Sequence, residues 1–527
     1  PPRQGDPPAG GLLAVAGGLL GRTRSVAVVG LEAVAVTIEA HVGSGLPGLT
    51  VIGSSGSAAR EAVHRVRTAL LAAELLPGAR KVLLALAPAE VPKAGARFDL
   101  GMALAVLVAV GTVPSTALDE VAVLGELGLD ATVRPVPGVL PAVGALPGTG
   151  VRTVLLPDGN AAEAALVEGL EIVPVADLGE AVAVLRGERG RRPTPDPQAP
   201  AVTPGAPDLA DVRGQAEARR ALEIAAAGGH HLLLIGPPGC GKSMLARRLP
   251  GILPPLTHTH AMELATIRSV AGRFAAESVT ALDTVPPFQA PHHGVSAPAL
   301  LGGGSGVAVP GAASLAHRGV LFLDELFEWA RAVLEGLREP LEEGVIRVAR
   351  SRATVTYPAR FQLVCAANPC PCGGGPHCRC ADEAIVSYRA KLSGPLADRL
   401  DLAPTVAPLA AADLLAGPPG ESSSAVASRV RAARSGAADR WGQGAVNAEA
   451  PASQLRSVTR PEALRVLAGA VERGELTGRG YDRVLRVART CADLDGAEVV
   501  GRSHALEAHA HRLALRTAGR LAEGAPA

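Results

Sequence analysis

The sequence predicts an α/β fold built around a phosphate-binding loop, and three observations support that fold class. Segments with strand-like and helix-like apolar spacing alternate along the chain. The apolar run 232–235 leads directly into a glycine-rich loop at 236–243. A second apolar run, 320–323, ends in two carboxylates, as expected of a neighbouring strand at the same nucleotide site.

Apolar periodicity gives the individual elements in chain order. Before residue 190 we expect strands over 25–42, a helix over 59–76, a strand over 82–87, a helix over 99–110 and a strand over 151–156. After residue 207 we expect a helix over 211–227, the strand that leads into the glycine-rich loop, and a helix over 243–249. A variable stretch over 257–316 precedes strands over 320–324 and 361–366. From 409 onward we expect helices, with a loop at 417–424.

A proline-rich segment divides the chain. The length of 527 residues suggests about three domains. Segment 191–207 carries repeated prolines without apolar periodicity, which is typical of an extended linker. We therefore expect an N-terminal domain over 1–190, a nucleotide-binding core over 208–405 and a helical C-terminal domain over 406–527.

Composition limits the possible environment and partners. A net charge of +1 gives no global attraction to nucleic acid, so any such site is a local basic surface. The longest apolar stretch, 100–113, is too short to span a bilayer, and the beginning of the sequence lacks a signal-peptide pattern. Seven cysteines, four of them clustered, suit a reducing compartment. We expect a cytoplasmic protein without membrane partners, whose extreme N-terminus is truncated or disordered.

The loop at 236–243 has the full pattern of a phosphate-binding loop. Lys242 is one of only four lysines among 51 basic residues, and a compact ammonium suits the β- and γ-phosphates of a nucleotide. The glycines let backbone N–H groups surround the phosphates. The expected nucleotide-binding residues are Gly236, Pro237, Pro238, Gly239, Cys240, Gly241, Lys242 and Ser243.

The two carboxylates at 324–325 complete this site. Ser243 and Asp324 are the expected Mg²⁺ ligands, and Asp324 belongs to the nucleotide site. Glu325 is the expected catalytic base, which polarises the water that attacks the γ-phosphate. Together the two motifs predict an ATPase that uses ATP and Mg²⁺.

Four cysteines form a candidate zinc site. The pattern C-x-C-x₅-C-x-C places four soft ligands around a flexible glycine turn, which suits a structural Zn²⁺ site. His377 is an alternative ligand, and four free thiols are the competing interpretation. The expected ligands are Cys370, Cys372, Cys378 and Cys380.

Longer motifs surround these sites in a fixed order. They include Asp211–Gln215, Arg220–His230, Ala290–His293, Gly302–Gly304, Ser314–Gly319, Asn368–Gly373 and Ser393–Asp401. In this order they resemble the YifB/ComM family of magnesium-chelatase-like AAA+ ATPases, over nearly the whole chain. The resemblance implies an AAA+ core with a C-terminal helical lid.

The resemblance also implies roles for single residues. Asn368 is similar to the sensor that positions the attacking water, and Arg399 to the arginine finger that reaches a neighbouring subunit's ATP. Arg479 resembles a second sensor in the lid. With Arg483 and Arg486 it equally fits an exposed basic stripe. A finger that acts on a neighbour implies a homo-oligomer, in this family a hexameric ring.

The N-terminal domain resembles the Lon-protease-like domain of this family, an α+β fold of the ribosomal S5 domain 2 type. Arg97 stands at the position of the proteolytic nucleophile, and a guanidinium is not an acyl nucleophile. Lys93 is interpreted as an ordinary loop lysine. We therefore expect a non-proteolytic domain.

Three functions compete. The resemblance favours a ring motor on branched or single-stranded DNA, a ComM-like branch-migration helicase of recombination and natural transformation. The second is a magnesium-chelatase-like ATPase that remodels a partner protein, and the third is an ATP-dependent protease without a recognisable nucleophile. The DNA-contacting candidates are the hairpin of Arg347, Arg350 and Arg352 and the stripe 479–486. His292 and His293 are expected to line the channel of the ring rather than to form a joint site.

Overall fold

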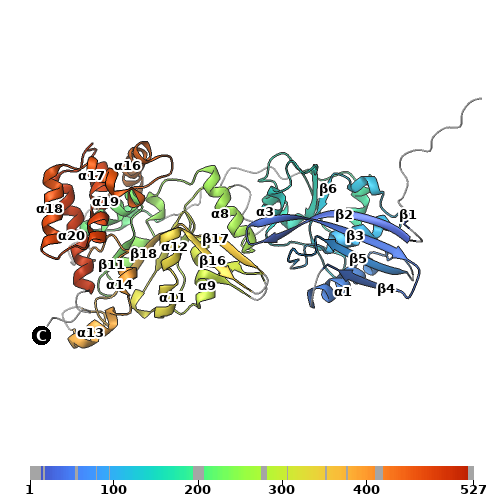
Figure 1. Ribbon diagram of the computed structural model, residues 1–527, viewed down its shortest axis with the longest axis horizontal. Helices are drawn as coiled ribbons and strands as arrows, with labels where there is room; N and C mark the ends of the chain where they lie inside the picture. Colours follow the sequence, from blue (N-terminus) through green and yellow to red (C-terminus); the bar gives the residue numbers. More distant parts are fainter. Residues whose placement is uncertain are drawn as a thin grey trace, which may run out of the picture.

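A computed structural model shows an elongated molecule with three parts in chain order (Figure 1). The N-terminal lobe lies at one end, the nucleotide-binding core in the middle, and a bundle of C-terminal helices at the other end. Most of the predicted linker 191–207 lies outside the described residues. The structure describes residues 14–15, 18–53, 57–76, 78, 80–93, 95–193, 207–274, 282–304, 307–350, 353–374, 378–409 and 419–519.

A mixed sheet forms the N-terminal lobe, with strand order β10-β9-β6-β2-β3-β5-β4 and β1 paired to β2. Helix α2 is buried along its whole length against β2. A Cβ at Gly21 of β2 would lie 2.1 Å from the Ala105 carbonyl of α2, so glycine permits this close packing. The elements are β1 (Ala14–Val15), β2 (Gly18–Val29), β3 (Glu32–Gly43), β4 (Gly48–Ile52), α1 (Ser57–Ala72), β5 (Lys81–Ala87), α2 (Asp99–Ala109), β6 (Val121–Val123), β7 (Glu126–Leu127), β8 (Val133–Arg134), α3 (Val139–Gly144), β9 (Thr153–Pro157), α4 (Ala161–Ala164), β10 (Glu171–Val175) and α5 (Leu178–Leu185).

A parallel sheet organises the core, with strand order β11-β18-β15-β12. Residues Leu402 and Thr405 add parallel bridges on the free side of β11. The elements are α6 (Ala216–Gly228), β11 (Leu232–Ile235), α7 (Lys242–Ala246), α8 (His258–Val270), β12 (Phe288–Gln289), α9 (Ala297–Leu301), β13 (Gly302–Gly303), β14 (Val309–Pro310), α10 (Ala312–Leu315), β15 (Val320–Leu323), α11 (Arg331–Glu335), α12 (Arg338–Glu343), β16 (Val345–Ala349), β17 (Thr354–Pro358), β18 (Gln362–Ala367), α13 (Asp382–Arg389) and α14 (Gly394–Ala397).

Because these strands are parallel, all their carboxyl ends meet at one edge of the sheet. We call this the carboxyl edge; it carries the loop 236–243, the pair 324–325 and Asn368. The opposite amino edge carries His231, which precedes β11, and Arg360, which precedes β18. This division of the sheet decides where each candidate residue acts.

The C-terminal helices pack on the core through α6, which contacts both α16 and α19. Apolar side chains of α6, β11 and these helices share one hydrophobic cluster, so the helical part is continuous with the core. The elements are α16 (Ser423–Trp441), α17 (Ala452–Ser457), α18 (Pro461–Glu472), α19 (Gly478–Leu494) and α20 (Arg502–Gly519).

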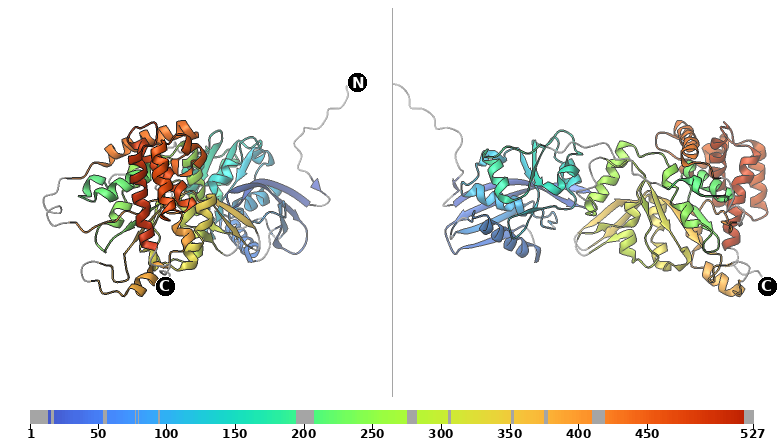
Figure 2. Two further views of the ribbon diagram at one scale, coloured as in Figure 1. Left: turned by 60° about the vertical axis from the view of Figure 1, so that its left-hand side comes forward. Right: turned by 180° about the vertical axis from the view of Figure 1, so that it is seen from behind.

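The N-terminal lobe lies beside the core, as the right-hand view of Figure 2 shows, and contacts it through the β2–β3 turn and the residues before α3. The turn between β2 and β3 reaches Val355 of β17, which lies 3.1 Å from a Cβ built on Gly30. The Gly138 N–H, just before α3, donates to the Ser269 carbonyl of α8 at 2.9 Å. Among the described residues, no helix is long and apolar enough to cross a membrane.

Some helices begin at other residues than the apolar periodicity predicts. The helix expected over 211–227 begins at Ala216, because Leu209–Asp211 forms a 3₁₀ turn and Gln215 takes a left-handed φ of 53°. The stretch 257–316, expected to be variable, holds α8, α9 and α10. Helix α16 begins at Ser423 within the expected loop, of which 417–418 lie outside the described residues.

Candidate functional site

The loop at 236–243 follows β11 at the carboxyl edge. Gly239 and Gly241 adopt φ values of 77° and 95°, in the left-handed region that favours glycine. A Cβ at Gly236 would lie 2.2 Å from the Val406 carbonyl, so the loop begins in close contact with the segment beside β11. Glycine at these positions lets the backbone turn tightly enough for its N–H groups to face a phosphate.

The Lys242 ammonium sits at the centre of this loop. It donates to the carbonyls of Gly236 and Pro237 at 2.7 and 2.8 Å, and to the Asn368 side-chain oxygen at 3.1 Å. Asn368 follows β18, the strand adjacent to β11. The structure therefore brings the loop lysine and the expected sensor into direct contact.

The two expected Mg²⁺ ligands also meet. The Ser243 hydroxyl donates to Asp324 Oδ2 at 2.7 Å. The Asp324 carbonyl accepts from Trp329 Nε1 at 2.9 Å, and Trp329 is buried, which fixes the turn after β15. A hydroxyl and a carboxylate oxygen are hard ligands of the kind that Mg²⁺ prefers, so this donor set fits the ion.

Glu325, the expected base, has a left-handed backbone with φ of 51°. Such a conformation is uncommon for a residue with a side chain and clusters at functional sites. The Glu325 side chain is half exposed and forms an ion pair with His293, Nδ1 to Oε2, at 2.9 Å. The Glu325 carboxylate is therefore accessible from solvent and lies against a second side chain.

The arrangement of His292 and His293 corrects the expectation that the two point apart, whereas their place in a channel of the ring stays a prediction. His292 and His293 were expected to point apart and to line a channel. Their rings lie 4.1 Å apart, because the segment is irregular rather than helical or extended. His293 belongs to the carboxyl edge beside Glu325.

Arg399 lies at the amino edge of the sheet. The Asp401 N–H donates to the His231 carbonyl at 3.0 Å, which places this segment where β11 begins. β11 has four residues, so about 13 Å of strand separates Arg399 from the loop of its own chain. Arg399 is buried, donates to the Pro395 carbonyl at 2.6 Å and contacts Glu342.

Arg479 shares the surroundings of Arg399 rather than those of Lys242. Burial, followed by the positive charges of Arg338, Arg483 and Arg479, lowers the pKa of Arg399. Arg479 itself is exposed at the start of α19. The expected arginine finger, Arg399, and the expected second sensor, Arg479, therefore lie close enough for the charge of one to act on the other.

The proposed stripe along α19 is not an exposed surface. Arg483 pairs with Asp401 at 2.8 Å, and the Arg486 guanidinium donates to the Ala450 carbonyl at 2.9 Å. Both side chains are only partly accessible. Of the three arginines, Arg479 alone is exposed.

The four cysteines come together beside the nucleotide loop. Their sulfurs lie within 4.8 Å of one another, with Cys370 Sγ 3.3 Å from Cys372 Sγ. A zinc tetrahedron with Zn–S bonds of ~2.3 Å has sulfur separations of ~3.8 Å, so the set fits Zn²⁺. The Gly374 N–H lowers the pKa of Cys372 to about 6, which favours the thiolate that binds metal. Residues 375–377, including His377, lie outside the described residues.

The loop after Cys372 also approaches the nucleotide loop. A Cβ at Gly373 would lie 2.8 Å from Pro238. The remaining cysteines, Cys240, Cys365 and Cys491, are buried singly, as expected for small core residues.

In the N-terminal lobe, Lys93 and Arg97 make structural contacts. The Lys93 ammonium donates to the backbone carbonyls of Pro88 and Val91, the latter at 3.2 Å. Burial lowers the pKa of Lys93 and lowers that of Arg97 to about 10. Arg97 donates to the Pro137 carbonyl at 2.8 Å. Neither group contacts a serine hydroxyl among the described residues.

Three family profiles match the chain, in the order of its parts. They are subunit ChlI of magnesium chelatase over 38–160, magnesium chelatase subunit ChlI over 208–414, and its C-terminal region over 420–512. A protein YifB of Escherichia coli K12 is 42% identical over 92% of this chain and 96% of its own length. The chain belongs to the YifB/ComM family of magnesium-chelatase-like AAA+ proteins.

Other members are similarly close. The competence protein ComM of Haemophilus influenzae is 39% identical over 93% of this chain and 97% of its own length. An uncharacterised protein of Mycobacterium tuberculosis H37Rv is 49% identical over 90% of this chain and 95% of its own length. Family membership therefore applies to the whole chain rather than to the nucleotide-binding core alone.

Two parts of this YifB/ComM-family chain were missed by sequence reasoning. One is the contact of His293 with Glu325, for which the only signal was a histidine pair in an irregular segment. The other is a large cavity at the amino edge, whose arginines come from segments far apart in the sequence. No local motif marks such a cavity.

Proposed function

We propose that this protein is an ATP-hydrolysing motor. The supporting observation is that Lys242, Ser243, Asp324, Glu325 and Asn368 converge at one edge of a parallel sheet. In this proposal Lys242 binds the β- and γ-phosphates of ATP, and Glu325 accepts a proton from the attacking water that Asn368 positions. Ser243 and Asp324 hold Mg²⁺, which neutralises phosphate charge when bound.

We infer further that the active unit is a ring of identical subunits, a hexamer as the family resemblance implies. Arg399 lies about one strand length from the loop of its own chain, so it acts on the ATP of a neighbour. Arg479, whose positive charge acts on Arg399, is the proposed second sensor of the lid. In this arrangement 208–405 is the ATPase core and 406–527 the helical lid. The N-terminal domain, 1–190, is a non-proteolytic Lon-like module.

The proposed substrate is DNA, branched or single-stranded, and the proposed activity is that of a ComM-like branch-migration helicase. Support comes from the name of the Haemophilus influenzae competence protein ComM and from the hairpin β16–β17. Arg350 near the hairpin tip is exposed and packs over Gly303 of the neighbouring β13. Arg347 is neutralised by Glu339 and Glu343, and Arg352 lies outside the described residues.

The test is the ATPase rate with and without branched DNA, together with DNA binding as a function of salt. We expect DNA to stimulate hydrolysis. We expect Arg350→Ala to weaken binding and to reduce the slope of log K against log salt by about 1. Arg347→Ala is the matched control on the same hairpin, since its charge is already paired. An ATPase rate unchanged by DNA, with no binding at low salt, contradicts the proposal.

A second candidate is an ATPase that remodels a partner protein. The profiles of a magnesium chelatase subunit favour it. The same assay separates the two, because a remodelling ATPase is stimulated by its protein partner rather than by DNA.

We also propose that Cys370, Cys372, Cys378 and Cys380 bind a structural Zn²⁺ that braces the loop between Asn368 and the contact with Pro238. Metal analysis of protein purified without chelator is expected to find one zinc per chain, and Cys372→Ser to lower that content. Zinc-free protein that is nevertheless folded contradicts this assignment.

A further inference from the structure

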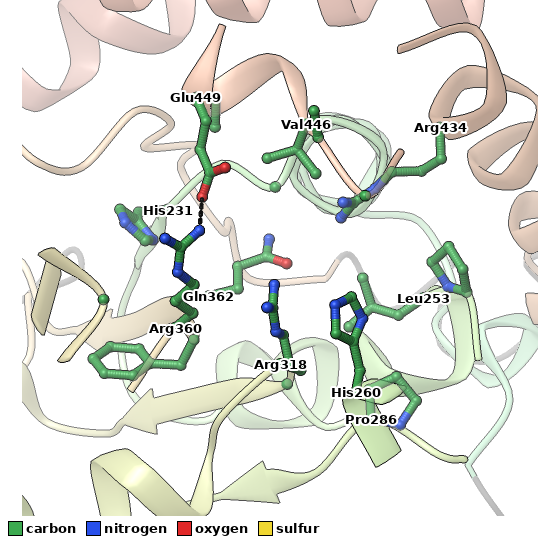
Figure 3. Close-up of a pocket in the computed structure, with 18 of the residues that line it drawn as sticks. His231, Leu253, His260, Pro286, Arg318, Arg360, Gln362, Arg434, Val446 and Glu449 are labelled. Atoms are coloured by element: carbon green, nitrogen blue, oxygen red, sulfur yellow. Dashed lines mark ion pairs between the residues drawn. The ribbon is translucent and has the colours of Figure 1, made fainter. Parts of the chain in front are cut away.

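A cavity of about 860 Å³ lies between the core and the C-terminal helices. Its floor is the amino edge of the sheet, where Arg318 precedes β15 and Arg360 precedes β18. In Figure 3, Arg318 and His260 point into the cavity from the core, and Arg434 points toward it from the helical side. The cavity is therefore on the opposite edge of the sheet from the loop 236–243.

Six arginines and four carboxylates line this cavity. Two of the carboxylates, Glu342 and Glu343, pair with Arg399 and Arg347, which are not among the lining residues. Three of its arginines have carboxylate partners: Arg318 with Glu263, Arg360 with Glu449 and Arg483 with Asp401. The Arg360–Glu449 pair is long, at 3.8 Å, and is drawn as the dashed line in Figure 3. The partnered arginines leave little net charge.

The three remaining arginines come from the helical side. Arg434 donates to the Ala226 carbonyl, at 2.7 and 2.9 Å, and Arg486 to the Ala450 carbonyl. Arg431 is exposed at the edge of the cavity. Among the described residues, no carboxylate lies within ion-pair distance of these three guanidinium groups.

In the pKa of two of them burial outweighs the nearby carboxylates, which are Glu449 beside Arg434, and Asp401 and Asp482 beside Arg486. Desolvation lowers the pKa of Arg434 to about 10 and lowers that of Arg486. The nearby His231 and His260 have pKa values lowered by burial, so they are neutral at pH 7 and do not add to the charge. An anion supplied from outside would offset the desolvation of these arginines.

The other wall of the cavity is apolar. It contains Leu253, Pro254, Pro255 and Pro286, all from the core. The volume falls in the range of small-ligand sites, about 300–1,000 Å³. Guanidinium groups from separate elements suit several phosphates at once, and an apolar wall suits a base or sugar.

We propose that this cavity is a second nucleotide site, which binds a free nucleoside polyphosphate between the core and the helical lid. Its phosphates face Arg431, Arg434 and Arg486, and its base faces the apolar wall. Because the two walls belong to different parts of the chain, the bound ligand ties the lid to the core. This site does not depend on hydrolysis or on DNA binding.

The experiment uses the full chain with Lys242→Ala and Ser243→Ala, which disable the phosphate-binding loop. Fluorescence anisotropy of mant-ATP is expected to show binding of about one nucleotide per chain, displaced by pyrophosphate. In this background Arg434→Gln, Arg486→Gln and Arg431→Glu are each expected to weaken binding about 10- to 100-fold, the value of a charge-assisted hydrogen bond. Arg465→Gln, an exposed arginine of α18, is the matched control and is expected to have no effect.

Three results overturn the proposal. The first is that the disabled-loop protein binds no mant-ATP. In that protein no subunit holds a nucleotide in its own loop, so the arginines would then serve only a nucleotide bound in the loop of a neighbouring subunit. The second is that single-stranded DNA displaces mant-ATP more effectively than pyrophosphate does, when both are compared at equal total phosphate concentration. The cavity would then belong to the path of the DNA. If Arg431→Glu, which disturbs no packed contact, leaves binding unchanged in a protein with an unaltered thermal melt, the bound nucleotide lies elsewhere.

Discussion

The two edges of the core sheet differ in how complete they are within one chain. At the carboxyl edge, Lys242 contacts Asn368, and Ser243 contacts Asp324, each through a direct hydrogen bond. At the amino edge, Arg399 and Arg479 lie near each other with no phosphate-binding loop beside them. One edge holds the groups that we propose to bind and hydrolyse a nucleotide, and the other holds the proposed arginine finger away from that loop.

This difference suits the proposal that each ATP site is shared between two chains, with its loop from one and its finger arginine from the other. A finger arginine at the amino edge has a function only where another chain's carboxyl edge faces it. When the amino edge of each subunit contacts the carboxyl edge of the next, the contact is heterologous. Repeated contacts of this kind close into a ring if the rotation between subunits allows it. The asymmetry of the sheet is thus the physical basis of the ring that we propose.

The largest expected effect tests the carboxyl edge. Glu325→Gln removes the proton acceptor but leaves Lys242, Ser243 and Asp324 in place, so we expect ATP to bind while turnover falls about 10²- to 10⁴-fold. Equilibrium ATP binding and steady-state hydrolysis measure the two quantities. Glu328→Gln, in the same turn and exposed, is the control. Normal turnover in Glu325→Gln would assign the base to another residue.

A smaller effect concerns a buried histidine at the amino edge. His317 Nδ1 accepts from the Arg360 N–H at 3.1 Å, and Nε2 lies 3.0 Å from Glu263. Burial lowers the pKa of His317 from 6.5 to about 4, so the folded state favours the neutral ring. The unfolded chain binds the proton more tightly, so stability is complete above pH 6.5 and is lost as the pH falls toward 4, by at most about 3 kcal/mol.

Urea unfolding at several pH values measures this loss. We expect the free energy of unfolding of His317→Gln to change less between pH 6.5 and 4 than that of the wild type. This expectation holds whatever the effect of the substitution on stability at pH 7. A slope identical to that of the wild type would show that other groups, such as His231 with its similarly lowered pKa, carry the whole effect.

The smallest expected effect returns to the carboxyl edge. The His293–Glu325 pair is partly exposed, and such pairs contribute at most about 1 kcal/mol, so His293→Ala is expected to lower turnover by no more than about fivefold. His64→Ala, on α1 of the N-terminal lobe, is the control. A loss as large as that of Glu325→Gln would make His293 a catalytic residue rather than a positioning one.

The two edges also differ in how far the sequence predicts them. Lys242, Ser243 and Asp324 were predictable, because a glycine-rich loop and an apolar strand with terminal carboxylates are local patterns and parallel strands align their carboxyl ends. The cavity was not, because Arg318, Arg434 and Arg486 meet only through the packing of the helices on α6. Periodicity likewise missed the late start of α6, which the left-handed Gln215 imposes.

The most direct test of the central claim, that each site is shared between two chains, mixes two inactive proteins. Lys242→Ala lacks a working carboxyl edge, and Arg399→Ala lacks a working amino edge. Where the two meet, the intact loop of the Arg399→Ala subunit faces the intact finger of the Lys242→Ala subunit. We predict that ATP hydrolysis, absent from each protein alone, reappears in the mixture. A mixture as inactive as its components, although the subunits assemble together, would contradict the account.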